Sequence, residues 1–159
     1  MTRLRGRAPR GQRVVDAVPH GHWKISTLIA ALDLHGMRCS MVWDGPVNGT
    51  AFQAFIAQVL VPQLRPGDLV VMDNLSSHKS PRVAELLRAA QADVVYLPPY
   101  SPDFSPIEPA FSKIKQALRS LAARAVDRLW SALQPVLDQI TPSDAAGFFR
   151  HCGYATEIN

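Results

Sequence analysis

The chain has 159 residues, enough for one compact domain that buries about two-thirds of the surface exposed by its unfolded form. Its composition, 47% hydrophobic and 19% charged, is that of an ordinary globular protein, and no run approaches the ~20 apolar residues of a membrane span. The formal charge of +4 favours anionic partners without identifying one. Two distant cysteines, Cys39 and Cys152, point to a reducing compartment and lack zinc-ligand spacing.

Residues 1–13 form a predicted basic arm. Gly6, Pro9 and Gly11 interrupt this segment, so it cannot form a regular amphipathic helix. Its arginines are Arg3, Arg5, Arg7, Arg10 and Arg13. An extended arm leaves these side chains free to meet phosphates, and the alternative is a solvated, disordered N-terminus.

The elements that follow predict an α/β domain. Apolar or β-rich runs predict strands at 14–18, 25–32, 37–43, 69–72 and 94–97. Helical spacing and cap signals predict helices at about 50–64, 81–90, 106–124 and 127–140, with a last short helix after Thr141-Pro142. A meander, then strand–helix–strand, then terminal helices suits one mixed sheet flanked by helices. No repeat or long linker divides the chain, so residues 1–159 are expected to be a single domain.

Two acids stand at the ends of the later strands. Asp73 directly follows the apolar run 69–72, at the carboxyl end of a strand, where open α/β sheets place ligands. Glu108 follows a proline-rich loop, and Ser105 with Glu108 also matches a capping box with Pro106 at the first helical position. Each acid alone therefore has a structural alternative, Asp73 as a turn residue and Glu108 as a cap.

Together the acids belong to a longer pattern. Residues 70–79 read Val-Val-Met-Asp-Asn-Leu-Ser-Ser-His-Lys, residues 97–108 read Leu-Pro-Pro-Tyr-Ser-Pro-Asp-Phe-Ser-Pro-Ile-Glu, and 34 residues lie between Asp73 and Glu108. Further landmarks are His22-Trp23-Lys24, Trp43-Asp44-Gly45-Pro46, Asn48-Gly49 and Val61-Pro62. In motif, order and spacing the chain closely resembles the bacterial insertion-sequence branch of the mariner-like DDE transposases. The resemblance implies a ribonuclease-H-like fold.

The resemblance also implies a site and a cofactor. In that family three carboxylates hold two divalent ions, Mg²⁺ or Mn²⁺, which activate the attacking oxygen and stabilise the leaving oxygen of a phosphodiester. Asp73 would be the second acid and Glu108 the third, both catalytic and metal-binding. Asn74 and His78 match motif positions and are assigned to positioning or local hydrogen bonding. For His78, a loop histidine bonded to nearby backbone is an equal alternative.

The pattern is incomplete at its N-terminal side. The family's first acid lies on a central strand that precedes a segment like 5–11, so we expect the domain to lack that strand and its aspartate. Neither Asp16 nor Asp44 falls in the motif position. Strands left without their central neighbour expose unpaired backbone groups, so we expect a marginally stable or self-associating chain.

Three functions follow as hypotheses. The first is the C-terminal part of a transposase whose partners are transposon ends, target DNA and itself or the full-length enzyme, in the bacterial cytoplasm and on the nucleoid when DNA-bound. The second is an inactive remnant that binds DNA or the intact transposase. The third is an unrelated hydrolase using Asp73 and His78, which no nucleophile elbow, glycine-rich loop or zinc spacing supports.

Overall fold

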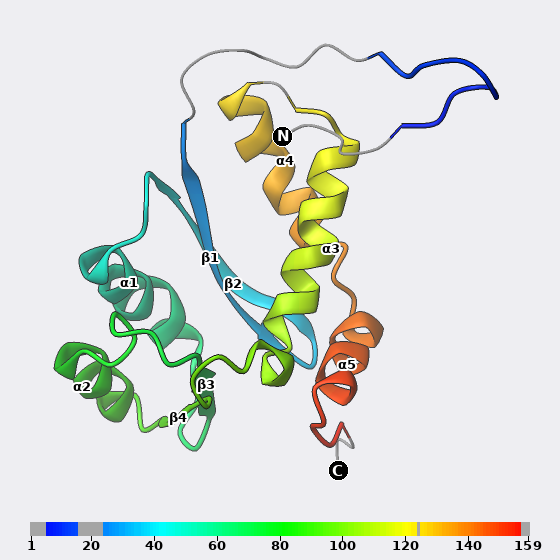
Figure 1. Cartoon of the computed structure of the whole chain (residues 1–159). Helices are drawn as coiled ribbons and strands as arrows, with labels where there is room; N and C mark the ends of the chain where they lie inside the picture. Colours follow the sequence, from blue (N-terminus) through cyan, green and yellow to red (C-terminus); the bar gives the residue numbers. More distant parts are fainter. Residues whose placement is uncertain (1–5, 16–23, 124, 157–159) are drawn as a thin grey trace.

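The computed structural model of the protein describes residues 6–15, 24–123 and 125–156. Its strands are β1 (Ser26–Asp33), β2 (Gly36–Asp44), β3 (Leu69–Met72) and β4 (Asp93–Tyr96). Its α-helices are α1 (Gly49–Phe55), α2 (Pro81–Ala89), α3 (Ile107–Ser120), α4 (Val126–Leu137) and α5 (Pro142–His151). In Figure 1, α1 and α2 lie on one side of the strands and α3, α4 and α5 on the other. The predicted α/β architecture is confirmed.

The strands form two separate pairs. β1 and β2 make an antiparallel hairpin whose register runs from Ser26 opposite Asp44 to Asp33 opposite Gly36. β3 and β4 run parallel, with Leu69 opposite Asp93 and Met72 opposite Tyr96. Within the described ranges no hydrogen-bonded ladder joins the two pairs. The single mixed sheet that we predicted is therefore divided into two pairs among the described strands.

Two hydrophobic clusters hold these layers together. The first fills the space between the strands, α1 and α2, and its buried members are Phe52, Phe55, Ile56, Leu60, Val83 and Leu87. The second lies between the β1–β2 hairpin and the C-terminal helices, and its buried members are Ile114, Leu118, Leu133, Val136, Leu137 and Ile140. Side chains alternate across a strand, so β1 sends Ile29 to the first cluster and Leu28 to the second.

One glycine fixes how the hairpin meets the C-terminal helices. Gly36 follows the two-residue turn between β1 and β2 with φ +124°, a conformation that residues with a side chain rarely adopt. A Cβ there would lie 2.5 Å from the carbonyl oxygen of Ile140, in the link between α4 and α5. The hairpin and this link therefore approach each other too closely for any other residue.

The helix predicted at 50–64 is continuous but changes its hydrogen-bonding pattern. After α1 it continues as a π-helical turn, Ile56–Leu60, and a 3₁₀ turn, Val61–Gln63. Pro62 has no backbone N–H and cannot extend the α-helical pattern. The other predicted helices agree within a few residues, and Ser80 caps α2 as expected, its side chain accepting the N–H of Val83.

The strand predicted at 14–18 is wrong where it can be judged. Val14 and Val15 are exposed and not in a strand, because no neighbouring strand covers them, while 16–18 lie outside the described residues. Among the helices of the described ranges, none is long and apolar enough to cross a membrane.

Candidate catalytic site

The pairing of β3 with β4 creates the candidate site. In a parallel pair the carboxyl ends of both strands meet at one edge, so the loops after Met72 and Tyr96 lie side by side. The ladder extends one residue further, since the N–H of Leu97 donates to the carbonyl of Met72 at 2.8 Å. Together with the start of α3, these loops enclose a pocket of about 390 Å³. It is lined by residues 73–75, residues 97–102, Ser105 and Glu108.

Asp73 lies at the entrance of this pocket with one carboxylate oxygen engaged. Its Oδ1 accepts the backbone N–H of Leu75 at 3.2 Å, the bond by which an aspartate closes a tight turn. Half of the Asp73 side chain (51%) is exposed. The turn role that we considered as an alternative is thus real, and it leaves Oδ2 without a hydrogen-bond partner among the described residues.

His78 approaches the same oxygen. Its Nδ1 lies 2.6 Å from Oδ1 of Asp73, but Nδ1 is buried and no described group meets it in hydrogen-bonding orientation. The imidazole stacks on Phe52 at a centroid distance of 4.0 Å, and the hydroxyl of Tyr96 donates to the His78 carbonyl at 3.1 Å. His78 is thus held from two sides and keeps the Asp73 carboxylate in place.

Asn74 contributes an unused acceptor. Its side chain lines the pocket beside Asp73, and its Oδ1 is buried without a hydrogen-bond partner among the described residues. Leaving a buried amide oxygen unpaired costs about 1–3 kcal/mol. Such a group is typical of a position where a ligand completes the hydrogen bonding.

The loop that carries the chain from β4 to Glu108 is fixed at several points. Ser101 donates from its hydroxyl to the carbonyl of Pro99 at 3.3 Å, and a 3₁₀ turn, Pro102–Phe104, follows. The hydroxyl of Tyr154, which lies after α5, donates to the carbonyl of Phe104 at 2.8 Å. These bonds and the proline content fix where α3 begins.

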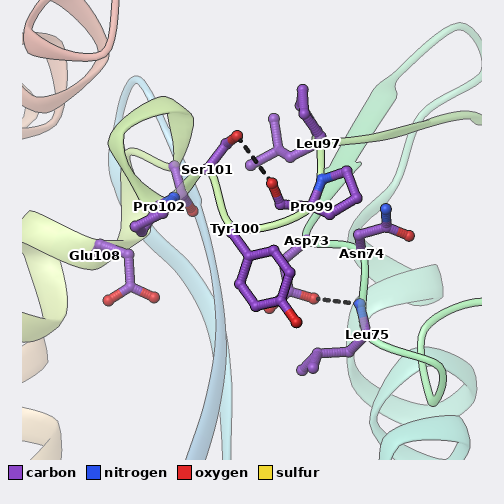
Figure 2. A pocket seen from close by; sticks show the side chains of 11 residues that line it. Asp73, Asn74, Leu75, Leu97, Pro99, Tyr100, Ser101, Pro102 and Glu108 are labelled. Carbon is purple, nitrogen blue, oxygen red and sulfur yellow. Dashed lines mark hydrogen bonds between the residues drawn. The ribbon is translucent and has the colours of Figure 1, made fainter.

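Glu108 stands in the first turn of α3, but the predicted capping box is wrong. The helix begins at Ile107 with Pro106 as its N-cap, so Glu108 is the second helical residue and not the third. Its N–H bonds to the carbonyl of Ser105 at 3.1 Å instead of the hydroxyl. The exposed Glu108 carboxylate has no partner within the described part of the chain. Figure 2 shows it on one side of the pocket, with Asp73 and Asn74 on the other.

Comparison with known proteins now identifies the family. Residues 1–129 match the DDE superfamily endonuclease family. The chain belongs to this superfamily. No curated protein matches it by sequence.

The DDE assignment agrees with the fold of solved transposase structures. The chain is similar to the Mos1 transposase paired-end complex with left transposon end, with a TM-score of 0.71, 20% identity and 95% of this chain covered. It is also similar to the Mos1 strand transfer complex (TM-score 0.66, 18% identity) and the Mos1 mariner paired-end complex with Mn (0.66, 20%), each over 95% of this chain. The chain spans 46–47% of the matched chains, about half their length.

The oxygen ligands in the pocket of this DDE domain partly suit a hard cation. Carboxylate and amide oxygens are the ligands that Mg²⁺ and Mn²⁺ prefer, and the pocket offers those of Asp73, Glu108 and Asn74. In the described ranges no group of three or more His, Cys, Asp or Glu side chains could hold a metal ion. The pocket therefore offers two carboxylates, those of Asp73 and Glu108.

The predicted basic arm lies elsewhere. Arg7, Arg10 and Arg13 are exposed, whereas Arg3 and Arg5 lie outside the described residues. In Figure 1 the described arm, in dark blue, is at the opposite end of the molecule from β3 and β4. The structure thus brings Asp73, Asn74, His78 and Glu108 together and leaves Arg7, Arg10 and Arg13 apart from them.

Two features of the site escaped sequence reasoning. The first is the stacking of Phe52 on His78, which links α1 to the site over a distance that no local pattern could reveal. The second is Tyr100, a pocket residue with φ +57°. An aromatic residue in the middle of a proline-rich loop was the available signal for Tyr100.

Proposed function

We propose that this chain is the C-terminal part of a bacterial insertion-sequence transposase of the mariner-like branch, which cuts and joins DNA by two-metal phosphoryl transfer. The observation that carries the proposal is the single pocket lined by both Asp73 and Glu108, the two acids of the motif. Membership of the DDE superfamily and the Mos1-like fold support it.

Asp73 and Glu108 are the proposed metal-binding catalytic residues. A pair of Mg²⁺ or Mn²⁺ ions, when bound, makes the attacking oxygen nucleophilic and stabilises the charge on the leaving oxygen. Leu75 and His78 both meet Oδ1 of Asp73, so they orient the carboxylate and leave Oδ2 for the cation. Asn74 is proposed to bind a metal-bound water or a substrate oxygen through its unpaired Oδ1.

The first acid of the set is proposed to come from a strand outside the described residues. A ribonuclease-H-like sheet joins an antiparallel hairpin to a parallel pair through one central strand. Here β1 pairs only with β2, and β3 only with β4, among the described strands. A strand placed between β1 and β3 would satisfy both open edges and bring its carboxylate beside Asp73.

The proposed partners are transposon ends, target DNA and a further transposase chain. The matched Mos1 structures are named as a paired-end complex and a strand transfer complex. In this chain the exposed arm with Arg7, Arg10 and Arg13 supplies positive charge for DNA phosphates, whose contacts weaken steeply with salt. The proposed location is the bacterial cytoplasm, on the nucleoid when bound to DNA.

The test starts with the DNA upstream of the Met1 codon, translated in every frame. The proposal expects a β-rich segment carrying an aspartate. The protein joined to that segment should cleave labelled transposon-end DNA with Mg²⁺ or Mn²⁺, and Asp73→Ala or Glu108→Ala should abolish cleavage. Glu85→Ala, at an exposed position on α2, is the matched control and should cleave normally. Cleavage that survives both site substitutions would contradict the proposal.

A second candidate is an inactive remnant that binds DNA or the intact transposase. The described residues favour it to the extent that they offer only two acids and no group of three metal-binding side chains. It expects salt-sensitive DNA binding that is lost when the five arm arginines are neutralised. It also expects no metal-dependent cleavage by any joined product.

A further inference from the structure

Tyr100 has a backbone conformation that its side chain does not favour. Its φ is +57°, and only two other non-glycine residues in the described ranges have positive φ, Gln91 and Ala122. Those two directly follow the C-caps of α2 and α3, Ala90 and Leu121, where the left-handed conformation is a common way to end a helix. Tyr100 ends no helix, and glycine would adopt its turn without strain.

The side chain of Tyr100 is also fully exposed. At 103% of its reference area it is the most exposed of the large hydrophobic residues in the described chain. The loop beneath it is firmly held, by the N–H of Leu97 on the carbonyl of Met72 and by the hydroxyl of Tyr154 on the carbonyl of Phe104. A strained and rigid turn therefore presents an aromatic ring to solvent, which neither folding nor solubility favours.

The position of the ring suggests its ligand. Tyr100 lines the same pocket as Asp73 and Glu108, and in the view of Figure 2 its ring is drawn over Asp73, with Glu108 on the far side of the pocket. A phosphate held there through a divalent cation would place the attached nucleotide within reach of Tyr100. Aromatic side chains stack on unpaired bases with little sequence preference, because every base offers a flat face. A paired base inside a duplex does not offer that face.

We propose that Tyr100 is a nucleobase-stacking residue, which binds an unpaired base next to the phosphate at Asp73 and Glu108. This inference rests on the proposed function and names a substrate feature, a base taken out of the duplex at the reacting strand end. Extracting a base is easiest where the strand is already frayed or cut. The ring thereby fixes the register of the DNA strand relative to the two acids.

The test uses the full chain with Ca²⁺, a hard cation for oxygen ligands, and a single-stranded oligodeoxynucleotide that carries 5-iodouracil. Dissociation constants come from fluorescence anisotropy, and the residue crosslinked by ultraviolet light is mapped by mass spectrometry. Tyr100→Ser and Tyr100→Gly should weaken binding about 5- to 150-fold, the range for losing one stacked base. Tyr100→Phe should bind like the parent, and the crosslink should map to Tyr100.

Two controls separate stacking from folding. Phe104→Ser removes an exposed aromatic ring of the same loop that does not line the pocket, and it should leave the dissociation constant unchanged. Tyr100→Gly should melt at or above the temperature of the parent, since glycine relieves the positive φ. Weak binding by a protein that is no less stable would then report a lost ligand contact.

The outcomes distinguish this inference from the function on which it rests. If the parent binds DNA, Tyr100→Ser binds equally well and the crosslinks map elsewhere, the stacking role is overturned while the proposed function stands. If Tyr100→Ser changes sedimentation of the chain but not DNA binding, the ring belongs to a protein contact and the inference is overturned. If the parent binds no DNA with Ca²⁺, the stacking role is overturned, while the proposed function is decided by the cleavage test on the joined protein.

Discussion

The two strand pairs differ in how much of their surface the protein covers. The β1–β2 hairpin is packed on both faces, with Ile29 and Met41 against α1 and its continuation, and Leu28 and Val42 against α3 and α4. The β3–β4 pair is packed on one face only. Val70, Met72 and Val94 point into the first cluster, whereas Leu69, Val71 and Val95 on the other face are exposed.

The hairpin therefore mainly stabilises the fold, whereas the β3–β4 pair carries the candidate site. The covered hairpin joins both hydrophobic clusters and so contributes to the whole core. The half-covered pair carries the pocket with Asp73 at its carboxyl end, and its open face and edge are where a further strand or chain is proposed to pack. Exposed apolar sheet surface of this kind marks an interaction site in a protein that is otherwise well packed.

The largest effect is expected at the hairpin turn. Gly36→Ala places a Cβ 2.5 Å from the Ile140 carbonyl oxygen at φ +124°, so it should lower the free energy of unfolding by about 2–4 kcal/mol. Gly147→Ala, in α5 with open space around it, is the matched control and should raise stability by up to about 1 kcal/mol. Urea denaturation measures both, and equal effects would show that the hairpin contact is absent.

A pair of leucine truncations compares the two strand pairs directly. Leu28→Ala removes a side chain packed in the second cluster and should cost about 2 kcal/mol. Leu69→Ala removes a side chain that is 59% exposed and should cost no more than about 0.5 kcal/mol. If Leu69→Ala proved as costly as Leu28→Ala in the isolated chain, the open face would already be covered.

The open face should also govern self-association. Val71→Lys places a charge on the exposed face of β3, so it should shift sedimentation velocity profiles toward monomer at high protein concentration. Its effect on unfolding should be within about 0.5 kcal/mol, because Val71 packs in neither cluster. Unchanged self-association would place the contact elsewhere on the chain.

The smallest effect is expected for the ion pair between Lys113 of α3 and Asp144 of α5. The hydrogen bond from Lys113 to Asp144, with those from Thr141, lowers the pKa of Asp144 from 3.8 to about 2. A depressed carboxyl pKa stabilises the fold above about pH 3.8, and that stabilisation is lost as the pH falls through about 2. Lys113→Met should raise the pKa of Asp144 toward 3.8 in a carboxyl NMR titration. Lys115→Met, two residues further along α3, should leave the pKa of Asp144 unchanged.

Local signals in the sequence predicted most of the elements. The apolar run 69–72 became β3 with the predicted bounds, and Ser80 followed by Pro81 began α2 as expected. Predictions failed where the structure depends on a one-residue shift or on a partner distant in the sequence. The helix after Pro106 begins one residue late and breaks the expected capping box, and Val14 and Val15 form no strand because no neighbour pairs with them.

The candidate site could likewise be predicted only in part. The resemblance assigned Asp73 and Glu108 to one site, and the parallel β3–β4 pair brings both to one pocket. The buried, unpaired oxygen of Asn74 and the left-handed turn at Tyr100 depend on backbone geometry that residue identities do not specify. The order of the elements suited one mixed sheet, whereas the described strands form two separate pairs.

The most direct test of the central claim is Mn²⁺ titration of the isotope-labelled chain, followed by paramagnetic broadening of backbone amide signals. We expect selective broadening of Asp73, Asn74 and Glu108, strongly reduced in Asp73→Asn and unchanged in Asp93→Asn at the other end of the β3–β4 pair. Broadening centred on other residues, or unchanged in Asp73→Asn, would contradict a metal site built on these two acids.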